Sequence, residues 1–256
     1  MDKYLLIIAV LFSYYFIVFI IGQLLKDNSI VDIGWGFSFV VTAVFSLVMY
    51  SDFHIRQLTV TLLVLIWGLR LTYHIGKRNI GKPEDFRYVN FRKKWGAKFV
   101  LLKAFLHVYV LQFIMSLLIS LSFIYINTNM NGDLTIVDYI GLGIWIIGFI
   151  FESLGDKQLK DFLANPDNNG EILTTGLYKY TRHPNYFGEA TMWWGIFIVS
   201  LSLPYGYLTI LSPIVITTLV RFVSGVPMLE KAFADNQKFQ EYAKVTNVFV
   251  PWLPKK

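Results

Sequence analysis

Cysteine is absent from the 256-residue sequence, and only 16% of its residues are charged. Without cysteine the chain has no disulfide framework, no thiolate nucleophile and no metal site built on cysteine. Soluble domains carry about a quarter charged residues, whereas 55% of this sequence is hydrophobic. These deficits exclude a small disulfide-bonded domain and predict an all-α, polytopic membrane protein.

Long apolar runs are abundant instead. Seven of them have about 18–25 residues, the length that a bilayer-spanning helix requires. They cover Tyr4–Leu25, Ile30–Tyr50, Leu58–Gly76, Phe99–Ile126, Leu134–Leu154, Tyr186–Leu203 and Tyr207–Val223. The first run is long and bulky, and no small-residue cleavage site follows it, so we expect a retained helix rather than a signal peptide. Because no internal repeat is present, we expect one integral membrane domain over residues 1–256.

Basic residues gather on one expected side of the membrane. The segment Arg70–Lys103 holds ten Lys or Arg, Lys157–Arg182 holds four, and the segment from Arg221 onward holds six. Since basic loops stay in the cytosol, we expect an external N-terminus and a cytosolic C-terminus. These bases border apolar runs, so the net charge of +6 does not indicate a nucleic-acid partner.

One polar stretch, GLYKYTRHPNYFGEATMWWG at Gly176–Gly195, leads into the sixth apolar run. Pro184 suits the first turn of a helix, where its missing N–H costs nothing. A helix that begins at the membrane surface offers free N–H groups and a positive dipole to an anionic ligand. The alternative is a basic loop with an aromatic belt, but a belt does not require His, Asn and Glu at fixed offsets.

Ionisable residues inside apolar runs mark a site or an ion pair. Asp32 lies about one turn into the second run, and the alternative is a carboxylate that stabilises the helix N-terminus. Arg70 and His74 lie four residues apart on a helix face that could look at Asp32. Each also has a simpler explanation, because Arg70 can snorkel and His74 can lie at the interface.

A hydrophilic loop is expected from Lys77 to Lys98. Within it Arg87 and Tyr88 follow a proline-containing turn and could reach back over a pocket mouth. The later group Arg92-Lys93-Lys94-Trp95 alternates bases and aromatics like an interfacial anchor.

Glu152, Asp156 and Lys160 recur every four residues at the end of the fifth run and therefore share one helix face. Neighbouring acids repel, so the pair requires a cation, a hydrogen-bond donor or a polar ligand between its members. After the last run, the Pro227 region breaks the helix, and residues Met228 to Tyr242 predict an amphipathic surface helix.

These motifs resemble the C-terminal domain of the steroid 5α-reductases. The likeness rests on Glu152-x-x-x-Asp156, on Gly176-Leu177-Tyr178 followed by Arg182-His183-Pro184-Asn185-Tyr186-x-Gly188-Glu189, and on Phe249-Val250-Pro251. Uncharacterised bacterial relatives of these enzymes are more similar still, because Asp32-Ile33-x-Trp35-Gly36 and Glu84-Asp85-x-Arg87-Tyr88 also belong to their pattern. The resemblance implies a seven-helix membrane fold that binds NADPH from the cytosol. It also implies the reduction of a carbon–carbon double bond conjugated to a carbonyl.

Matching the motifs residue by residue implies a cofactor site. Its members would be Asp156, Tyr178, Arg182, His183, Asn185, Tyr186, Glu189 and Arg221, with Glu152 as the second acid of the stripe. Cofactor phosphates would meet Arg70, Arg87, Arg182 and Arg221, since guanidinium forks match phosphate oxygens. Asn185 and Glu189 would hold the nicotinamide amide.

The substrate carbonyl requires a donor where negative charge develops. Asp32 is the first choice, provided that burial keeps it protonated, and Tyr73 or His74 is the second. In the steroid enzymes a glutamate and a tyrosine lie near this carbonyl. Here Asp32 is the acid of the second span and Trp67 stands at the tyrosine position. No metal site is expected.

Two other function classes stay open. A shorter Arg-His-Pro-x-Tyr-x-Gly core also occurs in isoprenylcysteine methyltransferases, and a methyltransferase that uses S-adenosylmethionine would need fewer phosphate-binding arginines. A non-catalytic lipid-binding or transport protein would need polar groups through several spans, and the centres of the runs are mostly apolar. We expect an NADPH-dependent oxidoreductase that acts on a lipophilic, steroid- or isoprenoid-like molecule within the bilayer.

Overall fold

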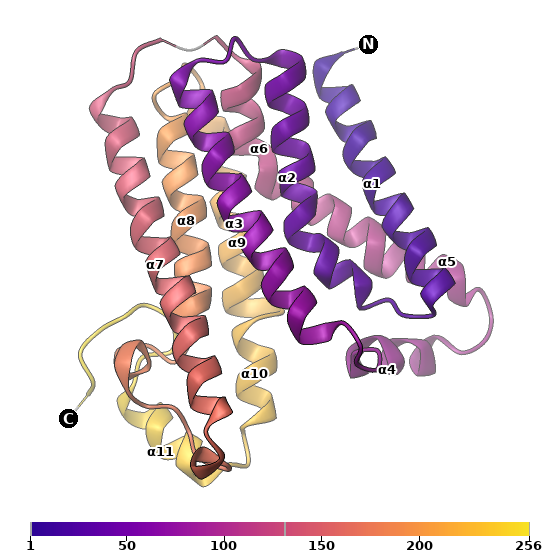
Figure 1. Ribbon diagram of the computed structural model, residues 1–256, viewed down its shortest axis with the longest axis vertical. Helices are drawn as coiled ribbons and strands as arrows, with labels where there is room; N and C mark the ends of the chain where they lie inside the picture. Colours follow the sequence, from indigo (N-terminus) through magenta and orange to yellow (C-terminus); the bar gives the residue numbers. More distant parts are fainter. Residues whose placement is uncertain (1, 131, 256) are drawn as a thin grey trace. The chain divides into compact units, whose positions relative to one another are not determined.

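The computed structural model describes residues 2–130 and 132–255. The chain divides into two compact units, unit 1 over residues 1–134 and unit 2 over residues 135–256. Regular structure in the described residues is helical throughout (Figure 1). The all-α prediction is confirmed, and the single integral domain stays a prediction.

Unit 1 consists of three long helices, a short helix and a final bipartite helix. Its elements are α1 (Lys3–Leu25), α2 (Ile30–Tyr50), α3 (Ile55–Asn79), α4 (Phe86–Trp95), α5 (Val100–Ala104), the π-helical stretch η1 (Phe105–Val110) and α6 (Leu111–Thr128). Within unit 1, α4 lies across the end at which α1 stops and α2 starts (Figure 1). The turn between α1 and α2 is therefore within reach of α4.

Local signals fix where these helices begin. Asp2 caps α1 by accepting from the Tyr4 amide at 2.8 Å, as N-cap carboxylates do. His54 and Gln57 form a capping box at the start of α3.

Where α2 crosses α3, a Cβ on Gly36 would lie 2.6 Å from the carbonyl oxygen of Gly68. Glycine at both positions lets the two backbones touch, the usual way in which helices associate in lipid.

Unit 2 is built on two long helices and a bent C-terminal section. Its elements are α7 (Ile136–Ala164), the 3₁₀ turns η2 (Pro166–Asn168) and η3 (Gly176–Lys179), α8 (Pro184–Ser200), the 3₁₀ turn η4 (Gly206–Ile210), α9 (Leu211–Thr218), the π-helical stretch η5 (Leu219–Val223), α10 (Val226–Ala232) and α11 (Gln237–Val245). Pro184 occupies the first turn of α8, as the sequence predicts.

A seam of glycines joins α7 to α8. On α7 the glycines are Gly141, Gly148 and Gly155, and on α8 they are Gly188 and Gly195. A Cβ on Gly148 would lie 2.6 Å from the carbonyl oxygen of Gly188, and one on Gly195 would lie 2.7 Å from that of Gly141. The seven-residue spacing repeats on one helix face about every two turns, so the backbones meet along most of α8.

The apolar runs predict the helices well. In the described chain six helical segments are long and apolar enough to cross a membrane, at Lys3–Leu25, Ile30–Tyr50, Ile55–Asn79, Val100–Thr128, Ile136–Ala164 and Gly206–Ala232. The sixth predicted run corresponds to α8, which has 17 residues, the lower limit of the range that suits a spanning helix. The protein is thus an integral, multi-pass membrane protein.

Two expectations need correction. The segment from Lys77 to Lys98 is not a continuous loop, because α3 extends to Asn79 and α4 fills much of the remainder. The surface helix predicted over Met228 to Tyr242 is divided into α10 and α11 by a turn in which the Phe233 amide donates to the Leu229 carbonyl. Asn236, the N-cap residue of α11, starts this second helix because its side chain accepts from the Phe239 amide at 3.1 Å.

Candidate functional site

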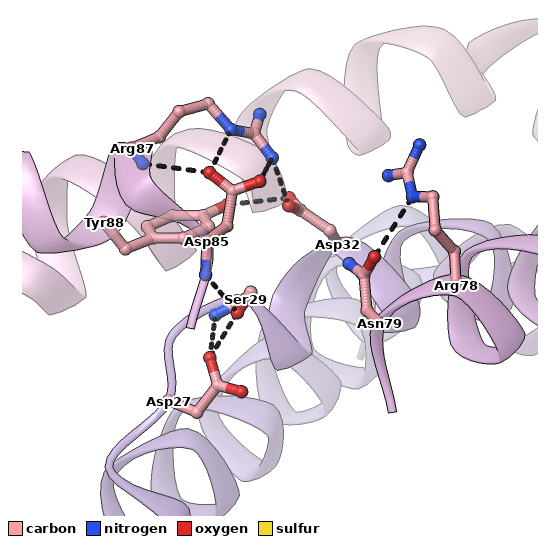
Figure 2. Close-up of polar contacts among 8 residues, drawn as sticks. All are labelled: Asp27, Ser29, Asp32, Arg78, Asn79, Asp85, Arg87 and Tyr88. Carbon is pink, nitrogen blue, oxygen red and sulfur yellow. Dashed lines mark hydrogen bonds and ion pairs between the residues drawn. The ribbon is translucent and has the colours of Figure 1, made fainter. Parts of the chain in front are cut away.

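The first polar cluster joins the start of α2 to the start of α4 in unit 1. Arg87 Nη2 donates to Asp32 Oδ2 at 2.6 Å, and the Tyr88 hydroxyl donates to Asp32 Oδ1 at 2.6 Å. Figure 2 shows both side chains reaching Asp32 from α4. Each oxygen of Asp32 thus accepts a hydrogen bond. The role of Asp32 as a proton donor stays a prediction, and these contacts compete with it.

Asp85 holds Arg87 from the other side. It caps α4 by accepting from the Arg87 amide at 2.9 Å, and it accepts from Arg87 Nε at 2.9 Å. The Asp85 amide donates to the Ser29 hydroxyl at 3.2 Å, next to the start of α2. Arg87 Nη1 makes no hydrogen bond with the described residues and points away from both carboxylates (Figure 2). Arg87 therefore retains one donor group for an anion.

A second ion pair lies beside the first. Arg92 Nη1 donates to Glu84 Oε1 at 2.8 Å, and Arg92 Nη2 contacts the other oxygen of the same carboxylate. The Asn28 amide also donates to Glu84 Oε1 at 2.8 Å, and the Tyr109 hydroxyl donates to Asn28 Oδ1 at 3.0 Å. The motif Glu84-Asp85-x-Arg87-Tyr88 thus ties α4 to the turn that precedes α2.

Burial and charge act together on the α4 side chains. Burial raises the pKa of Tyr88 well above its usual value of 10.0, and the neighbouring charge of Asp32 raises it further. Burial alone would raise the pKa of Asp85, but the hydrogen bonds and charge of Arg87 lower it below its usual 3.8. Burial alone would likewise lower the pKa of Arg87, but Asp85 and Asp32 raise it above its usual range. Asp85 and Arg87 are therefore both charged at neutral pH, and Tyr88 is protonated.

The second cluster, in unit 2, centres on Arg182. Arg182 Nε donates to Glu230 Oε1 at 2.8 Å, and Nη2 lies 2.7 Å from the same oxygen. Its Nη1 donates to the carbonyl oxygens of Ala243 at 3.1 Å and Thr246 at 2.6 Å. Every nitrogen of this guanidinium has an internal partner, and its side chain is only 11% exposed. The geometry makes Arg182 a tie to the C-terminal segment, a role that competes with the predicted role of phosphate ligand.

His183 shares the same carboxylate. Its Nε2 lies 3.1 Å from Glu230 Oε1, and its ring stacks on Tyr186 with centroids 5.8 Å apart. Burial lowers the pKa of His183 below its usual 6.5, although Glu230 opposes this effect. A neutral His183 that donates Nε2–H to Glu230 satisfies both groups at neutral pH.

The residues before α8 are held by the C-terminal segment. The Tyr242 hydroxyl donates to the Tyr178 carbonyl, and the Thr181 hydroxyl donates to the Phe249 carbonyl at 2.7 Å. The Arg182 amide donates to a further carbonyl in the same segment, that of residue 247, at 2.9 Å. Burial raises the pKa of Tyr178 and of Tyr242 above their usual range, so both phenols stay protonated. Residues 178–183 thus take their shape from residues far along the chain.

The start of α8 meets the end of α7 through polar side chains. Asn185 Nδ2 donates to Asp156 Oδ1 at 3.1 Å, so Asp156 has the hydrogen-bond donor that its acidic neighbour makes necessary. Gly155 brings the backbones together here, because a Cβ on it would lie 3.2 Å from the Asn185 amide nitrogen. His183, the N-cap residue, makes no side-chain cap hydrogen bond. The N-cap side chain therefore does not occupy the N–H groups of the first turn of α8, and these groups can serve an anion.

The remaining predicted site residues are spread over both units. Arg70, Tyr73 and His74 belong to α3, Glu152 to α7, Tyr186 and Glu189 to α8, and Arg221 to η5. Neither Arg70 nor His74 bonds to Asp32, which accepts from Arg87 and Tyr88 of α4. Tyr73 is 68% exposed, with the Lys77 ammonium 5.8 Å from its ring, which argues against a role as a positioned donor.

Two predicted site residues of unit 2, Glu152 and Arg221, have different surroundings. Glu152 is buried on α7, where a Cβ on Gly188 would lie 2.4 Å from its amide nitrogen. The Arg221 guanidinium lies over the Phe222 ring, 4.8 Å from the centroid. A groove of about 460 Å³ opens on the same unit. Its lining residues are Glu171, Ile172, Thr174, Lys179, Lys238, Glu241, Tyr242, Val245, Thr246 and Pro254.

A family model described as "Protein of unknown function (DUF1295)" matches residues 18–246. The chain belongs to this family. The family is steroid 5α-reductase-like, which confirms the resemblance seen in the sequence motifs.

Named relatives are distant. The chain is 28% identical to 3-oxo-5-alpha-steroid 4-dehydrogenase 1 of Macaca fascicularis over 117 residues, which are 44% of this chain and 40% of the relative. It is 27% identical to the Homo sapiens enzyme of the same name over 44% of this chain and 41% of the relative. An uncharacterized protein of Schizosaccharomyces pombe is 25% identical over 70% of this chain and 61% of the relative.

These matches are partial. The chain spans about 40–61% of the length of these relatives. No solved structure matches the chain significantly. Identity of this order supports a shared fold and function class more than a shared substrate.

Sequence reasoning missed several members of both clusters. Glu230 is the main one, because it binds Arg182 and His183 from 48 and 47 residues away, and spacing carries no information about such a contact. Glu84 and Arg92 were visible as charges, but their pairing follows from α4, which we expected to be loop. The available signal was the order Pro-Glu-Asp before a run with aromatic residues, since Asp85 is a favourable N-cap.

Proposed function

We propose that the protein is a membrane oxidoreductase that uses NADPH to reduce a carbon–carbon double bond conjugated to a carbonyl in a lipophilic molecule. The observation that carries this proposal is the match to the 3-oxo-5-alpha-steroid 4-dehydrogenases within a steroid 5α-reductase-like family. The polar clusters at Asp32 and at Asn185 support it, because each lies at an end of apolar helices.

Residues at the start of α8 in unit 2 are compatible with the cofactor requirement. Bound NADPH supplies a hydride. The start of α8 offers backbone N–H groups to a phosphate, and Asn185 is held in place by Asp156. Its side-chain oxygen remains available to accept from an amide, the role proposed for Asn185 together with Glu189.

The four candidate arginines do not suit phosphate binding equally. Arg87 retains Nη1 as a donor, so it can bind a phosphate oxygen without giving up Asp32 or Asp85. Arg182 would have to release Glu230 or a backbone carbonyl first. We therefore propose that Arg87 is the better placed of the two to bind a phosphate, and that Arg182 supports the segment before α8.

The substrate carbonyl needs a hydrogen-bond donor as negative charge develops on its oxygen. Asp32, Tyr73 and His74 remain the proposed candidates, and the geometry separates them. Asp32 accepts from Arg87 and Tyr88, and Tyr73 is largely exposed. His74 is half-buried on α3, which leaves it as the better placed of the three.

Ligand-dependent thermal stability in detergent tests the proposal. A ligand at about a hundred times its dissociation constant stabilises the native state by about 2.7 kcal/mol, which gives a clear melting shift. We expect NADPH to raise the melting temperature, and NADH to raise it less. Oxidation of NADPH should then depend on an added lipophilic enone.

S-adenosylmethionine serves as the comparison ligand. A melting shift with S-adenosylmethionine and none with either nicotinamide would overturn the oxidoreductase assignment and favour a methyltransferase. The variant Asn185→Ala tests the proposed cofactor contact, because it should reduce the melting shift with NADPH while leaving the Arg182 contacts intact.

A further inference from the structure

The basic segment between α3 and α5 has an unusual charge balance. Residues 77–103 contain two acids, and both are engaged by arginines, Glu84 by Arg92 and Asp85 by Arg87. Five lysines of the same segment make neither an ion pair nor a hydrogen bond with any described residue. They are Lys77, Lys82, Lys93, Lys94 and Lys98. The internal pairing therefore leaves an uncompensated positive surface.

The two faces of α4 are chemically different. Tyr88 lies on the inner face, in a buried cluster with Leu11 and Val108. Phe86 is 69% exposed, and Lys93 and Lys94 are exposed on the outer side. A helix with lysines and an aromatic residue on its free face is typical of segments that lie in the membrane interface.

The flanking spanning helices keep α4 near the membrane interface. α4 follows α3 and precedes the α5–α6 segment, and both neighbours are long and apolar enough to span the membrane. Six residues join α3 to α4 and four join α4 to α5. Connections this short keep α4 near the ends of two spanning helices, and Phe99, 65% exposed, starts the next one.

We propose that the outer face of α4 binds the headgroups of anionic phospholipids. The surface consists of Lys93, Lys94 and Lys98, with Phe86 and Phe99 as its exposed aromatic residues. The ammonium groups match phosphate charges at headgroup level, and the rings match the boundary between headgroups and acyl chains. The free lysines give the surface its preference for anionic over zwitterionic lipid.

The basic residues of unit 2 provide a contrast. Lys157 pairs with Asp161 at 3.4 Å, and Lys238 pairs with Glu171 at 2.5 Å. Part of the positive charge there is neutralised within the protein. Other lysines of unit 2 have no ion pair among the described residues, but acids balance them better: residues 156–182 hold four Lys or Arg and four Asp or Glu, whereas residues 77–103 hold nine and two. The α4 region therefore has the larger excess of positive charge.

A single reporter on α4 tests the proposal. The chain has no cysteine, so Asn90→Cys places one environment-sensitive dye on the exposed side of α4. The labelled protein is placed in nanodiscs of phosphatidylcholine with increasing phosphatidylglycerol. We expect a saturable change in emission as the anionic fraction rises, and its loss when the ionic strength is raised to about 1 M, where charges are screened beyond about 3 Å.

Two triple variants separate specific binding from general attraction. Each surface lysine contributes about fivefold to lipid affinity, so Lys93→Gln, Lys94→Gln and Lys98→Gln together should abolish saturation. The matched control replaces three exposed lysines of unit 2, Lys160, Lys231 and Lys244, by Gln. It changes the net charge equally and should leave the α4 response intact. Native mass spectrometry of unlabelled protein should show retained phosphatidylglycerol in the parent and loss in the first variant only.

Three results in the lipid experiments would overturn the proposal. They are an equal response to phosphatidylcholine alone, an unchanged response in the Lys93, Lys94 and Lys98 variant, and an equal loss in the unit 2 control. Inorganic phosphate that reproduces the emission change in phosphatidylcholine nanodiscs would also overturn it, because the surface would then bind a soluble anion.

Discussion

Two arginines, Arg87 in unit 1 and Arg182 in unit 2, serve the same local purpose in different ways. Each lies in a short motif and pairs with an acid that is distant in sequence, Asp32 or Glu230. Arg87 divides its contacts between two carboxylates and keeps Nη1 free, with 29% of its side chain exposed. Arg182 uses every nitrogen internally and is 11% exposed.

This difference shows that a conspicuous basic residue is not equivalent to a ligand site. Both arginines were assigned to phosphate from the sequence, and only the partners distinguish them. A guanidinium with a full set of acceptors gains little from a further anion, whereas one with a free terminal nitrogen can donate a charge-assisted hydrogen bond to it. The contacts therefore favour Arg87 over Arg182 in the proposed role of anion ligand.

Removal of Glu230 should have the largest effect. Glu230→Ala leaves Arg182 and His183 without their shared acceptor in a mostly buried setting. Breaking such a pair from one side destabilises a protein by about 3 kcal/mol. We expect a marked fall in the melting temperature measured in detergent without ligand.

The double variant Arg182→Met with Glu230→Leu is the control. Because it removes both charges, it should cost less than Glu230→Ala alone. If the double variant is the less stable of the two, the pair is not the main tie of the C-terminal segment.

The second prediction concerns Asp32. Asp32→Asn removes the charge that Arg87 contacts but keeps an acceptor for the Tyr88 hydroxyl, so it should cost about 1.5 kcal/mol. If both residues only position the anion site, Arg87→Gln and Asp32→Asn should lower the rate of NADPH turnover by similar factors. A loss of turnover in Asp32→Asn that far exceeds the loss in Arg87→Gln would favour Asp32 over His74 as the proton donor.

Tyr242→Phe should have a smaller effect. It removes the hydroxyl that donates to the Tyr178 carbonyl, a neutral hydrogen bond worth about 1 kcal/mol. Thermal melting should detect the change, and Tyr180→Phe, at a more exposed ring of the same motif, should be nearly silent. Equal shifts in melting temperature for both variants would show that the Tyr242 hydrogen bond stabilises the protein no more than the Tyr180 hydroxyl does.

The smallest effect should be the pH dependence of unit 2. Burial lowers the pKa of His183 in the folded state, whereas the unfolded chain titrates at about 6.5. The unfolded state therefore takes up the proton first, so stability falls as the pH drops through about 6.5 and levels off below the folded pKa. His183→Gln should flatten a melting curve measured against pH in this range.

The same experiment probes unit 1 at lower pH. The pKa of Asp85 is lowered in the folded state, so its contribution is present above its usual 3.8 and is lost as the pH falls below that value. Unit 2 should therefore loosen at a higher pH than unit 1. A His183→Gln protein that keeps the full dependence near neutral pH would rule out His183 as its cause.

Much of the fold follows from hydrophobicity alone. The apolar runs define the long helices, because a span in lipid must satisfy all its backbone groups internally. Pro184 marks the start of α8 for a similarly local reason. The break between α10 and α11 was not foreseen, because the apolar residues Leu229, Phe233 and Phe239 keep helical spacing across it.

The candidate site was predictable in part. Its residue types were identified from motifs, and Asp156 has the hydrogen-bond donor that its acidic neighbour made necessary. The partners were not predictable, since Glu230 and Tyr88 meet their targets through tertiary contacts. Those contacts decide whether a given charge is an internal tie or an available ligand.

The glycine seam of unit 2 also has a mechanical consequence. Gly148 and Gly188 touch backbone to backbone, with no flexible side chain between them to absorb a displacement. If α8 slid along α7 by one turn, larger side chains such as Met192 would replace glycine at this contact. The close backbone contact therefore opposes sliding of α8 along α7 and fixes the register of the two helices. The distance between Asn185 and Asp156 is then set by the seam, so loss of their hydrogen bond would leave both residues in place.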